Sequence, residues 1–148
     1  MTTYYYVEPE VAGQLGEETE MDRSVHPPKV THLQYEFHGW LGDDLLTTVS
    51  NYIVSEELME SITSSELTGC EVCNVEVAKS DEFKQLQSDT DLPDFYWLRI
   101  IGKAGEDDFG IADNNRLVVS EDALLLLEDV TIDQAKITEY DEGSKEST

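Results

Sequence analysis

The sequence predicts an α+β fold, with a mixed or mostly antiparallel sheet and two or three short helices. Short stretches rich in aromatic and β-branched residues, which are typical of strands, recur along the chain. Two of them lead directly into a serine followed by two acidic residues, which is typical of a helix start. Apolar residues make up 39% of the chain and include seven Tyr, four Phe and two Trp, so a buried core is expected despite the acidity.

Length and composition predict a single domain. The chain has 148 residues, which is about the size of one domain. We expect this domain to cover residues 1–140 and residues 141–148 to be a flexible polar tail. No apolar stretch reaches the ~20 residues that span a bilayer, and the start of the chain lacks the basic and apolar regions of a signal peptide. With two cysteines, the expectation is a cytoplasmic protein with reduced thiols.

Strands are expected where apolar side chains alternate or aromatic residues cluster. The strongest signal is in residues 95–101, where Tyr96 and Trp97 are followed by three aliphatic residues. Glycines on either side of Trp40 predict a turn there. The full set of expected strands is residues 4–7, 30–37, 52–54, 70–77, 95–101, 117–119 and 136–140.

Helix starts are the clearest local signals. Ser55 is a typical N-cap, because its hydroxyl can accept a backbone N–H and two glutamates follow it in the first turn. Ser120 precedes a second helix, whose apolar residues 123–127 predict burial. Gly69 is the expected end of the first helix, and residues 80–86 are expected to form another short helix.

The two predicted helix starts belong to an internal near-repeat. Residues 37–45 and 102–109 each contain a strand end, a turn with glycine, an Asp-Asp pair and an apolar residue. Further on, residues 53–59 and 118–124 each contain an apolar pair, a serine, two acids and a helical stretch. This indicates a duplicated β–turn–helix–β unit. The alternative is that any strand-to-helix junction favours Ser followed by Glu or Asp.

The charge of the chain argues against several classes of partner. Asp and Glu number 33 against nine Lys and Arg, which gives a formal net charge of -24 at pH 7. Nucleic-acid binding needs clustered Lys and Arg to neutralise phosphates, and anionic membranes attract basic segments. We therefore expect no nucleic acid and no membrane as partner. A basic protein is the partner that this charge favours.

The cysteines and histidines do not form a recognisable reactive motif. Cys70 and Cys73 match C-x-x-C, but residues three apart in a strand point to opposite faces, and the nearby glutamates would raise a thiol pKa. His26, His32 and His38 lack zinc-finger spacing and have no nucleophile at a matching distance. We therefore expect no catalytic residue and no cofactor.

The two aspartate pairs, Asp43-Asp44 and Asp107-Asp108, could supply oxygen ligands to a hard cation. Neither has the spacing of an EF-hand loop, and calcium needs six to eight oxygens. Roles in turns and helix caps are favoured, so no metal is expected.

Several stretches resemble a bacterial family of small acidic proteins of undefined activity. They are residues 6–13 (YVEPEVAG), residues 26–28 (HPP) and residues 39–45 (GWLGDDL). The junctions IVSE and LVVSE, together with Leu67-Thr68-Gly69, are similar to those of immunity proteins from polymorphic toxin systems. The resemblance loosely covers residues 4–140. It implies an inhibitor that neutralises a cognate toxin by stoichiometric binding, and it offers no active-site residue to carry over.

An immunity protein would attract a basic toxin through its acidic surface and hold it through apolar anchors. Trp40 is the candidate anchor, because it lies between two glycines beside an aspartate pair. The candidate acidic contact residues are Glu17, Glu18, Glu20, Asp43, Asp44, Glu106, Asp107 and Asp108.

Three other functions remain open at this point. A nucleic-acid mimic would occupy the basic groove of a protein that is not a toxin. A small enzyme or metal-binding domain would use the aspartate pairs and histidines. An acidic surface like that of halophilic proteins would have no specific partner and would keep the protein soluble.

Overall fold

The computed structural model describes residues 3–22, 24–25, 29–40, 42–48, 51–86, 92–112 and 116–140. In this part of the chain the α+β class is confirmed, with mostly antiparallel strand pairs and three short helices. The strands are divided among four sheets. The predicted tail, residues 141–148, and the segment of residues 26–28 lie outside the described residues.

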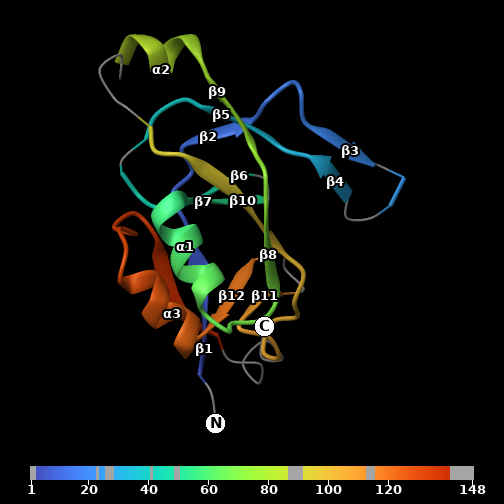
Figure 1. Cartoon of the computed structure of the whole chain (residues 1–148), viewed down its shortest axis with the longest axis vertical. Coiled ribbons are helices and arrows are strands. Elements are labelled where there is room, and N and C mark those ends of the chain that lie inside the picture. The colour runs from blue at the N-terminus through green and yellow to red at the C-terminus, as the bar shows by residue number, and fades with distance from the viewer. Residues whose placement is uncertain are drawn as a thin grey trace.

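The helices and strands follow one another as Figure 1 shows. The helices are α1 (Glu56–Ser64), α2 (Asp81–Leu86) and α3 (Glu121–Glu128). The strands are β1 (Tyr4–Glu8), β2 (Gly13–Leu15), β3 (Glu20–Asp22), β4 (Lys29–His32), β5 (Gln34–Phe37), β6 (Leu45–Thr48), β7 (Asn51–Ser55), β8 (Cys70–Cys73), β9 (Glu76–Lys79), β10 (Phe95–Ile100), β11 (Phe109–Ile111), β12 (Leu117–Ser120) and β13 (Lys136–Tyr140).

The two four-stranded sheets are built in the same way. One has the order β6-β7-β10-β8 and the other has the order β11-β12-β1-β13. In each, an antiparallel pair leads into a helix, α1 or α3, and the strand after the helix forms an edge of the same sheet. The remaining position is filled by β10 in the first sheet and by β1 in the second. We call these groups of strands, each with its helix, the first and second units. The predicted near-repeat corresponds to these equivalent units.

Both long helices begin where the sequence predicted. Ser55 Oγ accepts the backbone N–H of Leu58 at 3.3 Å, and Ser120 Oγ accepts that of Ala123 at 3.1 Å. These N–H groups would otherwise lack a partner in the first turn, so each serine stabilises its helix. The first helix ends before the predicted stop, with Ser65 as its C-cap. Gly69 follows with a φ of 95°, a conformation that favours glycine.

An aspartate supports each serine and also connects the two units. Ser55 Oγ donates to Asp44 Oδ1 at 2.6 Å, and Asp44 Oδ2 accepts the N–H of Thr131, which follows α3, at 2.8 Å. In the other unit, Ser120 Oγ donates to Asp108 Oδ1 at 2.7 Å. Asp108 Oδ2 accepts at 3.0 Å the N–H of the threonine that follows α1, Thr68. We call these two reciprocal arrangements the aspartate bridges.

The strands that lie between the units reinforce this connection. Beyond β1, Glu10 forms a parallel bridge with Leu46 in β6 of the first unit. Beyond β10, Lys103 forms a parallel bridge with Ile111 in β11 of the second unit. Each unit therefore contributes a chain segment that pairs with the other, and the two interlock.

The sheet β6-β7-β10-β8 separates two hydrophobic cores. Alternation along a strand sends successive side chains to opposite faces. Val54 and Leu98 therefore enter the core beneath α1 and α3, which we call the helix core. Ile53, Phe95 and Trp97 enter the other, which we call the aromatic core. Because both faces of β10 are buried, its sequence is a nearly continuous run of apolar residues.

Two predicted strands are divided in the structure, and four short strands were not predicted. The predicted strand of residues 30–37 is interrupted at Leu33, and that of residues 70–77 divides because β8 pairs with β10 whereas β9 pairs with β5. The strands β2, β3, β6 and β11 were not expected, because each is only three or four residues long. No helix of the described residues is long and apolar enough to cross a membrane.

The aspartate bridges make a prediction about stability. Ser120→Ala should cost about 1 kcal/mol of unfolding free energy, the usual value for a lost N-cap. Asp108→Ala should cost about 2 kcal/mol, because it removes the acceptor of both Ser120 and Thr68. Urea unfolding at neutral pH measures both values.

The matched control is Glu106→Ala, which removes a neighbouring carboxylate whose ion pair with Lys103 is exposed and should change stability by less than about 0.5 kcal/mol. The variant carrying both Asp108→Ala and Ser120→Ala should lose less than the sum of the single variants, since they share one hydrogen bond. Strict additivity would contradict the bridge.

Candidate functional site

Six of the eight acidic residues singled out in the sequence lie in two separate parts of the molecule. Glu17 and Glu18 follow β2, and Glu20 begins β3, where the backbone N–H of Glu18 donates to Gln34 Oε1 at 3.0 Å. Residues 106–108 precede β11, which lies apart from β3 and below it in the view of Figure 1. The structure therefore does not bring these carboxylates together on one face.

Asp43 is not on the surface at all. Its side chain is 0% exposed, so the expectation that it belongs to an exposed acidic face is wrong. Asp43 Oδ2 accepts the N–H of Gln134 at 2.8 Å, while Oδ1 has no hydrogen-bond partner in the described part of the chain. Burial raises the pKa of this carboxyl, and the negative charges of Asp133 and Asp44 add to the increase.

The remaining members of the aspartate pairs have structural roles. Asp44 and Asp108 hold the helix caps, which confirms the interpretation of these pairs as turn and cap residues. Asp107 Oδ2 accepts the backbone N–H of Lys103 at 2.9 Å within the turn. Glu106 is exposed. A contact between any of them and a partner stays a prediction.

Trp40 packs into the protein more than an exposed anchor would. Its ring lies edge-on to Phe95, with 6.0 Å between the ring centroids, and its Nε1 donates to the backbone oxygen of Asp43 at 2.9 Å. It is half-buried against the aromatic core. Its role in binding stays a prediction that rests on its exposed part.

A group of exposed carboxylates lies on α1 and α3, which pack side by side (Figure 1). Both helices bury apolar side chains such as Leu58 and Leu127 in the helix core, and both turn acidic side chains to the solvent. We call the exposed side of these helices the helix-pair face. Its carboxylates are those of Glu56, Glu57, Glu60, Glu121, Asp122 and Glu128.

Two features characterise the helix-pair face. No Lys or Arg occurs in residues 51–78 or 117–135, so the sequence offers neither helix a basic neighbour. Leu125, a large apolar side chain, is 59% exposed on α3. Neither feature is confined to this face, because residues 1–22 and 30–50 also lack Lys and Arg, and Leu86 and Ile101 are more exposed than Leu125.

The cysteines do not form a reactive pair. Both are free, and they lie at opposite ends of β8, with Cys70 against the helix core and Cys73 against the aromatic core. Burial raises the pKa of Cys70 to about 11, with a further contribution from the charge of Asp108. The Cys70 thiol therefore stays protonated near neutral pH and is a weak nucleophile.

The histidines of the described residues are engaged with neighbouring glutamates. His32 Nε2 lies 2.9 Å from a carboxylate oxygen of Glu76, and His38 Nε2 lies 3.0 Å from one of Glu36. Within the described ranges, no group of three or more His, Cys, Asp or Glu side chains is arranged to hold a metal ion. Among the residues that the structure describes, carboxylates are therefore the main chemical feature of the surface.

Comparison with known proteins does not assign the chain to a family. No protein-family model matches the chain, and no curated protein matches it significantly.

The buried carboxyl of Asp43 predicts a pH dependence. The pKa of this carboxyl in the folded state lies above the ordinary value of 3.8. The protonated group therefore contributes its full stabilisation below about pH 3.8. This contribution is lost as the pH rises through the folded-state pKa. Asp43→Asn keeps an acceptor for Gln134 and removes the buried charge. It should therefore increase the unfolding free energy at pH 7 by about 1 kcal/mol, and by less at pH 4.

Urea unfolding at both pH values measures this difference. Asp133→Asn, which neutralises an exposed neighbour, is the control and should have a smaller effect. A wild-type protein that is more stable than Asp43→Asn at pH 7 would contradict the assignment.

Proposed function

We propose that the protein is a non-catalytic inhibitor that neutralises a basic protein by stoichiometric binding, and that its partner is a toxin domain, which makes it an immunity protein. The observation that carries this proposal is the helix-pair face, where six exposed carboxylates lie on two packed helices. The resemblance of the strand-to-helix junctions to immunity proteins supports the choice of a toxin as partner.

Electrostatics explains why this face suits a basic partner. Carboxylates that are grouped without intervening cations create a local negative potential, which steers an oppositely charged protein and raises its association rate. Because the six carboxylates are exposed, they keep their hydration until the partner arrives. Exposed ion pairs contribute little affinity individually, so their main effect is expected on the rate of association.

Affinity requires apolar contacts in addition to charge. Binding energy at protein interfaces is usually concentrated in a few buried side chains that are surrounded by polar ones. Leu125 is the large apolar side chain among the acids of α3. We therefore assign it the role of anchor on the helix-pair face, in addition to any contribution from Trp40.

The proposal is tested with the partner captured from the native host and purified. A variant that combines Glu57→Gln, Glu60→Gln, Asp122→Asn and Glu128→Gln should associate about tenfold more slowly at low salt. The difference should shrink as salt screens the charges. Stopped-flow fluorescence over a range of salt concentrations measures this. Production of the wild-type protein should also protect cells that express the partner.

The matched control removes the same number of charges elsewhere, at β2 and β3, with Glu17→Gln, Glu18→Gln, Glu20→Gln and Asp22→Asn (Figure 1). Its association rate should fall less than about twofold, because these side chains lie away from the helix-pair face. Equal effects of both quadruple variants would show that only net charge matters and would contradict the assigned face. Displacement of the protein by duplex DNA from a partner that is harmless to cells would instead favour a nucleic-acid mimic.

A further inference from the structure

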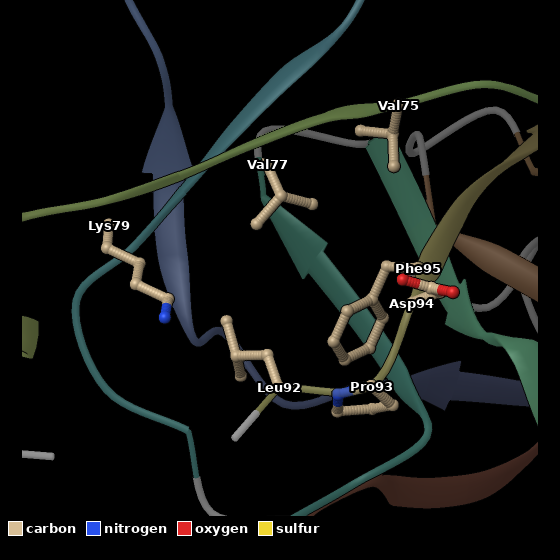
Figure 2. A pocket seen from close by; sticks show the side chains of 7 residues that line it. All are labelled: Val75, Val77, Lys79, Leu92, Pro93, Asp94 and Phe95. Carbon is tan, nitrogen blue, oxygen red and sulfur yellow. The ribbon is translucent and has the colours of Figure 1, made fainter. Parts of the chain in front are cut away.

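A groove separates strand β9 from the segment that leads into β10. It encloses about 430 Å³ and is lined by Val75, Val77, Lys79, Leu92, Pro93, Asp94 and Phe95. Figure 2 shows the apolar side chains between Lys79 at one end and Asp94 at the other. Val77 is 39% exposed there, although it is a β-branched residue in a strand. The groove thus combines an apolar floor with opposite charges at its ends.

The backbone of β9 is available for pairing on this side. β9 is an edge strand in the order β2-β5-β9. Its parallel pairing with β5 is extended by the N–H of Glu76, which donates to Leu33, and by the N–H of Ser80, which donates to Phe37. Alternation along the strand directs the backbone groups of Val77 and Lys79 away from β5. In the described part of the chain no strand pairs with that edge.

The groove is continuous with the helix-pair face. The backbone oxygen of Asp94 accepts the N–H of Glu56, the first residue of α1, at 2.9 Å. The backbone of Asp94 therefore lies against the first turn of α1, and the Asp94 side chain is exposed. At the other end, Lys79 Nζ lies 5.8 Å from the ring centroid of Phe83. The groove thus has the carboxylate of Asp94 at the end that adjoins α1 and the ammonium group of Lys79 at the other end.

We propose that this groove binds an extended segment of the basic partner, which adds as a strand to the free edge of β9. An apolar side chain of the segment packs on Val77, Leu92 and Phe95, and a Lys or Arg two residues away, on the same face of the added strand, pairs with Asp94. The inference rests on the proposed function, because it specifies how the same partner is recognised beyond the helix-pair face. An unpaired strand edge is otherwise a site of unwanted association.

The test uses a blocked pentapeptide, Thr-Val-Thr-Lys-Thr, as the probe, with amide shifts of the isotopically labelled full chain recorded by NMR. In an added strand the valine and the lysine share one face. We expect shift changes in residues 75–79 and 92–95. The peptide Thr-Val-Thr-Glu-Thr should bind about threefold more weakly, since an exposed ion pair is worth up to about 1 kcal/mol.

Two protein variants sharpen the test. Val77→Asp places a carboxylate on the apolar floor and should weaken binding of the lysine peptide about tenfold. Asp94→Lys should reverse the preference between the lysine and glutamate peptides. A retained preference for lysine, shift changes confined to α1 and α3, or no shift changes up to the solubility limit of the peptide would each overturn the proposal.

This test is separate from that of the proposed function. The quadruple variant of the helix-pair face should bind the peptide within about twofold of the wild type, because its altered side chains do not line the groove. Failure of the peptide experiment would leave the salt-dependent association of the partner intact. If the partner fails to associate but the peptide still binds, the proposed function is overturned and the proposal about the groove is not.

Discussion

The two aspartate bridges are the interactions on which the arrangement of the molecule depends. Each aspartate holds the N-cap of its own helix and the backbone that follows the helix of the other unit. Removing one carboxylate therefore affects both units at once. The bridges fix where α1 and α3 begin, and these starting points determine which side chains of the helices face the helix core.

The helix-pair face follows from this arrangement together with the composition of the helices. Apolar residues such as Leu58 and Leu127 enter the helix core, so the acids between them are turned outward. Their mutual repulsion is tolerated because water and salt screen exposed charges, whereas the cost would be large in the interior. Asp43 is the opposite case, because its carboxyl is buried and burial raises its pKa. Six carboxylates are tolerated on the two helices because they stay exposed.

The sequence predicted what depends on local interactions. Ser55 and Ser120 were identified as caps because a cap needs only a hydroxyl before a helical stretch. The α+β class and the roles of Asp44 and Asp108 in turns and caps were also predicted. Four short strands, β2, β3, β6 and β11, were missed because each spans only three or four residues. A pattern of only three residues carries little periodicity.

The acidic site could not be predicted in the same way. Among 33 acids, the sequence gives no direct measure of exposure, so adjacent aspartates were selected because they stand out. Asp43 proved to be buried, and the acids on α1 and α3 were overlooked because helix surfaces are commonly charged. Residues 51–78 and 117–135 lack Lys and Arg, but residues 1–22 and 30–50 lack them too, so this absence alone would not have singled out the helices. Only the packing of α1 against α3 brings the acids of the two helices together.

The most direct test of the helix-pair face is carboxyl footprinting of the complex with its partner. Carbodiimide-mediated coupling of an amine labels exposed carboxylates, and mass spectrometry locates the label. The account predicts that binding slows the labelling of Glu57, Glu60, Asp122 and Glu128, while Glu17 and Glu20 react as in the free protein. Unchanged labelling of the two helices in a fully formed complex would contradict it.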